Sequence, residues 1–316
     1  MWNFPLFPEQ ASSNAVRVDS LFLFELGIVF FFATLICVLI LCFAVRYRRG
    51  SNVDRSHPPT SSRRLEALWI GIPLALSLVM YVWATVLFFD LYEPPGDAFE
   101  VSVVGKQWMW HLQHPEGRGE INELHVPIGQ PVKLTMTSQD VIHSFFVPAF
   151  RIKQDVLPGR YTELWFRPTK VGRHHLFCAE YCGTNHSLMT GWVYVMEQAD
   201  YERWLSERGS GPSMAEEGEQ LFVRHHCAGC HQGSQIVHAP RLEGVFGHPV
   251  PIQEGKDVRF VVADDRYIRD SILMPKSEVV AGYEPVMPSF KGQIDEQDLL
   301  KLLAYIKSIG TKEAGQ

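Results

Sequence analysis

Two long apolar runs near the N-terminus constrain the fold most strongly. Leu21–Val45 contains one charged residue, Glu25, and Leu65–Phe89 contains one, Glu66. Each run has 25 residues, and at about 1.5 Å per residue such a helix exceeds the roughly 30 Å hydrocarbon core of a bilayer. Core helices of soluble proteins are usually shorter and keep a polar face, so two membrane spans, residues 21–45 and 65–89, are favoured over two buried helices.

The segment between the two runs, residues 46–64, is strongly basic. It carries six arginines against one acid, Asp54, whereas acids follow the second run. Because Lys and Arg are enriched in cytoplasmic loops, we expect residues 46–64 to be cytoplasmic, with residues 1–20 and everything beyond about residue 90 on the periplasmic side of a bacterial inner membrane. The first run is longer than a signal-peptide core and lacks a small-residue cleavage site, so this topology does not require signal-peptide cleavage.

Beyond residue 90 the apolar pattern changes from continuous to alternating. Pro131–Thr137 alternates apolar and polar side chains, as a half-buried strand does. Comparable short segments are separated by Pro/Gly turns and occur at 99–104, 121–126, 143–149, 161–166, 173–178 and 191–196. Many short strands at this spacing predict a β-sandwich or barrel, which we assign to residues 90–208.

One loop of this region concentrates side chains that bind soft metals. Two thiols, an imidazole and a thioether fall within twelve residues, at Cys178, Cys182, His186 and Met189. His143 stands 35 residues before Cys178, where the preceding strand can bring its ring to the same end of the sandwich. Thiolate, imidazole and thioether together favour copper among the first-row metals.

Other interpretations of the loop use fewer of its side chains. A Cys178–Cys182 disulfide is natural outside the cytoplasm. Zinc on two Cys and two His leaves the methionine unused, because thioether is a poor zinc ligand. A mononuclear blue-copper site needs a single cysteine. Two coppers bridged by two thiolates use every ligand.

Four motifs in this part of the chain resemble those of cytochrome c oxidase subunit II. They are the loop from Cys178 to Met189, Asp140–Ser144, Leu157–Arg160 and Gln107–Trp110, and the likeness covers roughly residues 20–205. The resemblance implies a cupredoxin-like Greek-key barrel that holds a dicopper centre, CuA. It implies that Cys178 and Cys182 are bridging thiolates and that His143 and His186 are terminal nitrogen ligands. The Met189 thioether and the main-chain carbonyl of Glu180 would be weak ligands.

The same resemblance implies three further roles. The Glu180 carboxylate would help to hold a magnesium ion at the boundary with subunit I. Trp108 would receive electrons from cytochrome c, although Met109 departs from the aromatic residue that is usual there, and a strand tryptophan also serves in simple packing. Glu66, in the Glu66–Trp69 segment, would guard a proton-uptake path of the catalytic subunit, whereas the alternative is a carboxylate that only extends to the membrane surface.

The C-terminal region carries a haem-attachment motif. Residues 209–213 have the composition of a flexible linker, and a helix is expected from Met214 to His226. Cys227–His231 then has the Cys-x-x-Cys-His pattern, in which both thiols bond to haem vinyl groups and the histidine faces the iron. The downstream segments Arg241–Gly247 and Gly282–Phe290 and a closing helix, 295–309, resemble a small all-α class I cytochrome c, assigned to residues 214–316.

Several residues compete for the second axial position on the haem iron. The methionines are Met214, Met274 and Met287, and the histidines His238 and His248 are further alternatives. Met287 is favoured because it directly precedes the last helix, the usual place in cytochromes of this type. Because haem c is attached outside the cytoplasm, this domain agrees with the orientation deduced from the arginines.

The two domains together resemble subunit II of a caa3-type oxidase. This implies that electrons from a cytochrome c or an upstream respiratory complex reach subunit I, which reduces oxygen to water with proton translocation, in a complex that also holds subunit III. This chain lacks the intramembrane histidine cluster of an oxygen-reducing site. Alternatives are a stand-alone electron relay, a copper-free quinol-oxidase subunit and a nitrous- or nitric-oxide reductase component. The net charge of −6 provides no basic surface for nucleic acid.

Overall fold

The structure is a computed structural model that describes residues 7–54, 56, 61–207, 212–232, 239–255 and 257–311. The chain divides into two compact units. One is Ser13–Glu93, and the other is Pro94–Gln316 together with Met1–Ser12. The expected linker residues 209–211 and the candidate ligand His238 lie outside the described residues.

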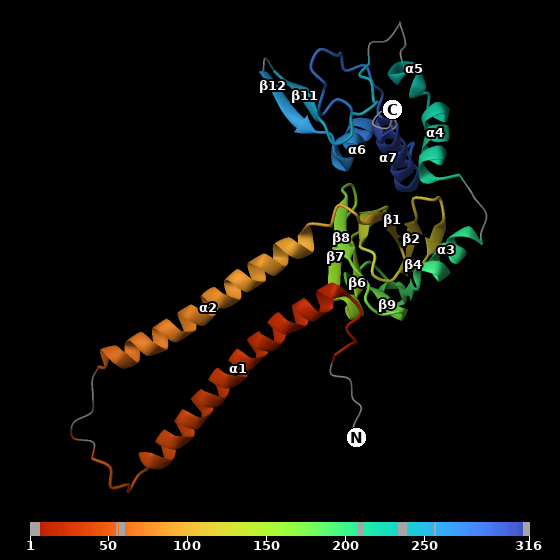
Figure 1. Cartoon of the computed structure of the whole chain (residues 1–316). Coiled ribbons are helices and arrows are strands. Elements are labelled where there is room, and N and C mark those ends of the chain that lie inside the picture. The colour runs from red at the N-terminus through yellow and green to blue at the C-terminus, as the bar shows by residue number, and fades with distance from the viewer. Residues whose placement is uncertain are drawn as a thin grey trace. The chain divides into compact units, whose positions relative to one another are not determined.

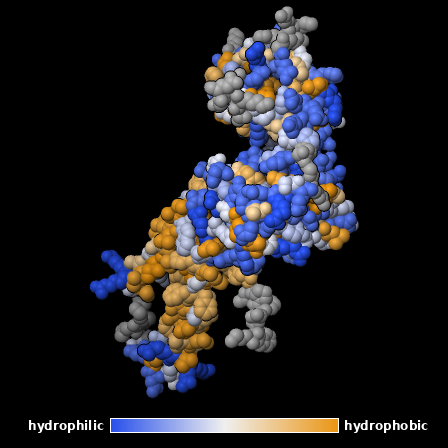
Figure 2. Space-filling view, turned by 45° about the vertical axis from the view of Figure 1, so that its right-hand side comes forward, coloured by the Kyte–Doolittle hydropathy of each residue, from blue (hydrophilic) through white to orange (hydrophobic). Residues whose placement is uncertain are grey.

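The smaller unit contains the two long helices, α1 (Ser13–Arg46) and α2 (Arg63–Tyr92) (Figure 1). By length and composition both could cross a membrane. Most of their large apolar side chains are exposed, and Figure 2 shows a continuous hydrophobic surface over them. Such a surface is stable in lipid and unfavourable in water, so the two helices fit membrane spans.

Both helices extend beyond the apolar runs that predicted them. Helix α1 begins at Ser13, eight residues before Leu21. The apolar run did not predict these residues, because the first turns of the helix are polar and carry no periodic apolar signal. Within this unit Arg17, near the start of α1, forms an ion pair with Asp90, near the end of α2. Ser62 caps α2, its hydroxyl accepting a hydrogen bond from the Leu65 amide.

The β domain consists of two five-stranded sheets. The first has the order β3-β2-β1-β5-β8, and the second has the order β4-β10-β9-β6-β7. In chain order the strands are β1 (Phe99–Lys106), β2 (Met109–Gln113), β3 (Gly119–Ile121), β4 (Glu123–Pro127), β5 (Val132–Ser138), β6 (His143–Val147), β7 (Ile152–Val156), β8 (Thr162–Phe166), β9 (Gly172–Cys178) and β10 (Thr190–Met196).

The inner faces of these sheets form the core of the domain. Its largest fully buried side chains include Trp110, Phe145, Phe150 and Phe166. Burial alternates along β10, where Gly191, Val193 and Val195 face inward, as the period of two requires. Short 3₁₀ turns, η1 (Pro148–Phe150) and η2 (His186–Leu188), and helix α3 (Gln198–Ser206) complete the domain. The prediction of a β-sandwich of the cupredoxin type is confirmed.

The C-terminal domain is mainly helical, with α4 (Met214–Arg224), α5 (Ala228–His231), α6 (Asp265–Leu273) and α7 (Glu296–Thr311). Leu221 and Phe222 of α4 pack in one buried cluster with Leu299 and Leu303 of α7. Gly218 permits this close crossing, because a Cβ atom there would lie 2.0 Å from the Lys301 carbonyl oxygen. The domain also contains a two-stranded hairpin, β11 (Pro249–Glu254) and β12 (Asp257–Val262), which an all-α description omits.

Candidate functional site

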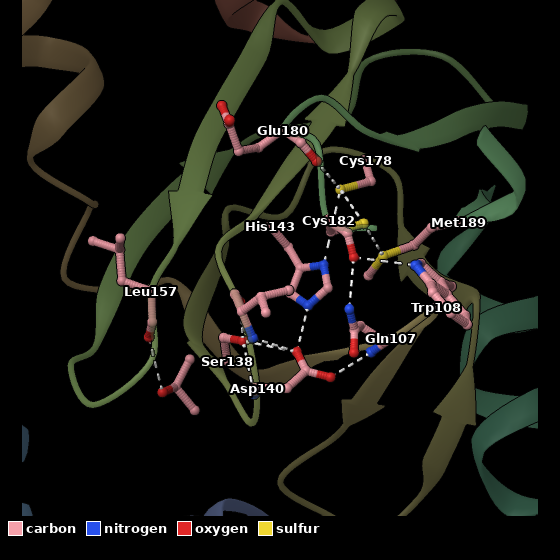
Figure 3. Close-up of polar contacts among 12 residues, drawn as sticks. Gln107, Trp108, Ser138, Asp140, His143, Leu157, Cys178, Glu180, Cys182 and Met189 are labelled. Carbon is pink, nitrogen blue, oxygen red and sulfur yellow. Dashed lines mark hydrogen bonds and ion pairs between the residues drawn. The ribbon is translucent and has the colours of Figure 1, made fainter. Parts of the chain in front are cut away.

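The proposed copper ligands meet at one end of the second sheet. His143 is the first residue of β6, and Cys178 is the last residue of β9. The two strands are antiparallel, with Phe145 opposite Cys178, so the start of one and the end of the other meet. The loop that follows carries Cys182 and His186 and returns through Met189 into β10. Figure 3 shows the imidazole of His143 and the sulfur atoms directed toward one another.

The donor atoms of the site lie at spacings of 3.3–4.0 Å. Cys178 Sγ is 3.8 Å from Cys182 Sγ and 4.0 Å from His143 Nδ1. Cys182 Sγ is 3.5 Å from His186 Nδ1 and 3.8 Å from Met189 Sδ. A disulfide bond is about 2.05 Å long, so the two cysteines are present as separate thiols. The sulfur-rich donor set suits copper, which thiolate, imidazole and thioether favour.

Most of the expected ligands are shielded from solvent, whereas His186 is partly exposed. His143 and Met189 are fully buried, and Cys182 and Cys178 are 2% and 8% exposed. Burial opposes ionisation of Cys178, but a hydrogen bond with His143 and bonds to nearby main chain lower the pKa of its thiol to about 6. Burial and the neighbouring Cys178 raise the pKa of Cys182. Of the two thiols, Cys178 is therefore the one that ionises more readily.

The glutamate of the loop presents its two oxygen-bearing groups in different directions. The Glu180 carbonyl oxygen lies 3.3 Å from Cys178 Sγ, whereas Figure 3 shows the Glu180 carboxylate pointing away from the sulfur atoms. The residue as a whole is exposed. This arrangement leaves the carboxylate available to a separate ligand outside the sulfur cluster.

Asp140 and Gln107 contact the expected ligands directly. Both occur in the motifs that carry the family resemblance, but neither was predicted to have a role. Asp140 Oδ1 lies 2.8 Å from His143 Nε2, which orients the ring so that Nδ1 faces the thiols. The main-chain amide of Gln107 donates to Asp140 Oδ2 at 2.7 Å. Burial opposes ionisation of Asp140, but hydrogen bonds from the Gln107 and Val141 amides and from His143 lower its pKa.

The other two residues with an expected role lie in different surroundings. Trp108 is partly buried against the core, and its indole Nε1 donates to the Cys182 carbonyl at 3.2 Å. Trp108 therefore contacts the copper loop directly. Glu66 lies in the first turn of α2 and is exposed, outside the β domain.

The haem-attachment motif forms a short helical turn. Cys227 is the N-cap of α5, and His231 is its last residue. His231 Nδ1 lies 2.8 Å from the Pro240 carbonyl oxygen and donates to it, which leaves Nε2 available to bind iron. Cys227 is partly buried against the helical core, and burial raises the pKa of its thiol. This arrangement fits a covalently attached haem whose iron is bound through His231.

The methionines of this domain differ in environment. Met287 is partly buried and packs against the same apolar cluster as Cys227. Met274 is 43% exposed and lines a surface pocket together with Met287. Met214 is buried in a separate cluster with Val104 and Leu300.

Comparison with known proteins assigns the two domains to families. A family model described as the periplasmic domain of cytochrome c oxidase subunit II matches residues 118–196, and one described as cytochrome c matches residues 215–310. Cytochrome c oxidase subunit 2 of Thermostichus vulcanus is 30% identical over 253 residues, which cover 63% of this chain and 77% of that protein. The chain belongs to the cytochrome c oxidase subunit II family.

Another relative aligns over more of the chain, and a solved structure matches one domain. The subunit 2 of Alkalihalophilus pseudofirmus is 28% identical over 286 residues, 85% of this chain and 80% of that protein. Among solved structures, the periplasmic domain of subunit II of cytochrome oxidase from Bradyrhizobium japonicum is 30% identical and covers 36% of this chain and 94% of that one, with a TM-score of 0.35.

The expected combination of a subunit II domain and a fused cytochrome c domain is thus confirmed and fits subunit II of a caa3-type oxidase. The first domain implies copper, and the second implies haem. Together with the two helices that could span a membrane, membership of this family makes the chain a membrane-anchored component of a haem–copper oxidase.

Proposed function

We propose that this chain accepts electrons through a covalently attached haem c and passes them through a dicopper centre to subunit I, which reduces oxygen to water with proton translocation. The observation that carries the proposal is the convergence of two thiols, two imidazoles and a thioether within about 4 Å at one end of a sheet. When bound, two coppers that share two thiolates spread one electron over both ions.

The side chains hold this site in three ways. Cys178 and Cys182 would bridge the two ions, and His143 and His186 would bind one ion each. Met189 and the Glu180 carbonyl would be weaker ligands. Because His143 and Met189 are fully buried and His186 only partly exposed, burial would limit solvent reorganisation around the site on reduction and so lower the barrier to electron transfer.

The proposal extends to the haem, to a magnesium ion and to the partners of the chain. Cys227 and Cys230 would attach the haem, with His231 and Met287 as its axial ligands. The exposed carboxylate of Glu180 would face a magnesium ion at the contact with subunit I. Subunit III and a donor, either a cytochrome c or an upstream respiratory complex, complete the set of partners. Trp108, hydrogen-bonded to the Cys182 carbonyl, provides a second route for electrons into the copper site.

The orientation in the membrane is part of the proposal. Six arginines between α1 and α2 would hold residues 46–64 on the cytoplasmic side of a bacterial inner membrane. Both redox domains then lie on the periplasmic side, where haem c is attached.

The first test is electronic absorption and electron paramagnetic resonance of the full chain, matured with haem and loaded with copper. We expect a mixed-valence dicopper signal beside a low-spin haem band. Cys182→Ser is expected to abolish the dicopper signal and leave the haem band unchanged. Cys42→Ser, in the exposed surface of α1, is the matched control and is expected to change neither. A haem band without a dicopper signal in the unsubstituted chain would refute the copper assignment.

A second measurement separates an oxidase subunit from a stand-alone electron relay. Purification in mild detergent is expected to retain a catalytic subunit that carries its own haem and copper. Metal analysis of the whole complex also distinguishes an oxidase from a nitrous- or nitric-oxide reductase, and recovery of the chain alone would favour the relay.

A further inference from the structure

We propose that Gln107 is a positioning residue that ties the Cys182 loop to the His143 turn and so holds the two halves of the copper site in one arrangement. The inference deepens the proposed function and rests on it for the role of the site, but the contacts belong to the protein alone. Gln107 itself is not a metal ligand.

Gln107 reaches both halves of the site through two different groups. Its side-chain Nε2 donates to the Cys182 carbonyl oxygen at 2.8 Å. Its main-chain amide donates to Asp140 Oδ2 at 2.7 Å, and the other oxygen of Asp140 lies 2.8 Å from His143 Nε2. Figure 3 shows this chain of contacts running from the Cys182 carbonyl to the imidazole. A single residue therefore connects a thiol ligand with an imidazole ligand that is 39 positions away in sequence.

The loop around Cys182 is shaped to accept this amide. Gly183 has φ of +114°, and a Cβ atom there would lie 3.0 Å from Gln107 Nε2. The positive φ favours glycine at this position, and a Cβ atom would also crowd the amide group of Gln107. The Cys182 carbonyl also accepts the indole Nε1 of Trp108 at 3.2 Å, so two consecutive residues hold one carbonyl.

The position of Gln107 explains why a side chain at the surface can matter to a buried site. Gln107 is exposed, whereas Cys182 is 2% exposed. Loss of the Gln107 side-chain amide removes the shorter of the two side-chain hydrogen bonds to the Cys182 carbonyl and leaves the 3.2 Å bond from Trp108. A net hydrogen bond contributes about 0.5–1.5 kcal/mol, which corresponds to about a 2- to 10-fold change in a loop-opening equilibrium.

The test compares Gln107→Leu and Gln107→Glu with Gln113→Leu in the full chain. Leucine removes the donor, and glutamate keeps the shape of the side chain but places a carboxylate against the carbonyl. Gln113 is the matched control because its Nε2 also donates to a main-chain carbonyl, that of Gly117 at 3.3 Å, in the hairpin that follows.

The first readout is the alkylation rate of Cys182 in the reduced, copper-free chain, followed by peptide mass spectrometry. Both Gln107 variants are expected to react about 2- to 10-fold faster than the unsubstituted chain, and Gln113→Leu at the original rate. The second readout is copper release to a chelator from the loaded chain, where the same order is expected.

The two readouts separate failure of this inference from failure of the proposed function. Unchanged alkylation in both Gln107 variants, or equal acceleration in Gln113→Leu, overturns the positioning role whatever the metal content. Accelerated alkylation in a chain that gives no dicopper signal would support the positioning role and refute the proposed function.

Discussion

The side chain of Glu120, which is 6% exposed, holds two histidines of the barrel in place away from the copper site. Its carboxylate lies 2.8 Å from His114 Nε2, contacts His125 Nδ1 and accepts the His125 amide at 3.0 Å. The rings of Tyr194 and Trp204 each stack against the ring of His125, with centroid separations of 4.5 and 4.4 Å. Burial alone would favour the neutral acid, but these hydrogen bonds lower the pKa of Glu120 to about 2.

The pKa of Glu120 makes the stability of this domain dependent on acid. Because the folded-state pKa lies below the unfolded value of about 4.3, the ionised carboxylate stabilises the fold above that pH. The stabilisation is lost as the pH falls from about 4.3 toward 2. We expect Glu120→Gln to lower the free energy of unfolding by about 3 kcal/mol at pH 7, with the difference from the unsubstituted chain shrinking in acid.

Chemical denaturation at pH 7 and at steps down to pH 3 measures this difference. The matched control is Glu123→Gln, on the neighbouring strand and exposed, for which little change is expected. Equal loss of stability in the two variants at pH 7, or a difference that does not vary with pH, would contradict the prediction.

At the scale of strands and helices, success in prediction followed the strength of the local pattern. Burial alternates in β10 and the sequence shows it, so the strand could be located within a residue or two. In β7 two consecutive central residues, Gln154 and Asp155, are both partly buried, and no alternation marks the strand. The β11–β12 hairpin of the C-terminal domain was not predicted, because Pro249 and Pro251 lie within β11 and proline usually indicates that a segment is not a strand.

The copper loop could be recognised because its ligands are close together in sequence, but its supporting residues could not be assigned. Gln107 acts through its main-chain amide and its side-chain Nε2, and Asp140 acts through its carboxylate. These contacts join segments that are far apart in the chain and depend on how the strands pair, which local sequence patterns do not show. The family resemblance identified the motifs without giving these two residues a role.

The segment before α7 allows a test of the second axial ligand. Met287→Leu is expected to remove the sixth ligand, convert the ferric haem from low spin to high spin and lower its reduction potential. Met274→Leu is the matched control and is expected to keep the low-spin spectrum, because Met274 is 43% exposed whereas Met287 packs against the haem-domain core. Absorption and paramagnetic resonance spectra of the ferric protein measure the change. A spin change in Met274→Leu alone would reverse the assignment.

At the scale of the whole molecule, the order of membrane hairpin, barrel and cytochrome domain could be predicted from hydropathy, alternation and one cysteine motif. These signals are local and strong, so they survive without an alignment. The exact ends of α1 and α2 could not, because polar turns continue a helix beyond its apolar run. The unit that contains α1 and α2 leaves most of its apolar surface uncovered, as expected for helices that are surrounded by lipid.

We propose that Glu66, in the first turn of α2, takes part in proton uptake by the assembled oxidase. Glu66→Gln removes the charge at the start of α2 and is expected to slow oxygen consumption several-fold, with the copper and haem spectra unchanged. Glu25→Gln in α1 is the matched control, since Glu25 and Glu66 are the single charges of their apolar runs. Oxygen uptake and stopped-flow proton uptake measure the effect. Equal activities in both variants and the unsubstituted enzyme would leave Glu66 with a surface role only.

The 3.8 Å separation of the two thiols sets an order of events in biogenesis. Without metal, the sulfur atoms are less than 2 Å further apart than they would be in a disulfide, and one of them is readily ionised. If the domain lies in an oxidising compartment, as we propose, such a pair can close to a disulfide, which would not accept copper. We therefore expect copper loading of this chain to require a thiol reductant first, so that assembly of the oxidase would begin with a reduction.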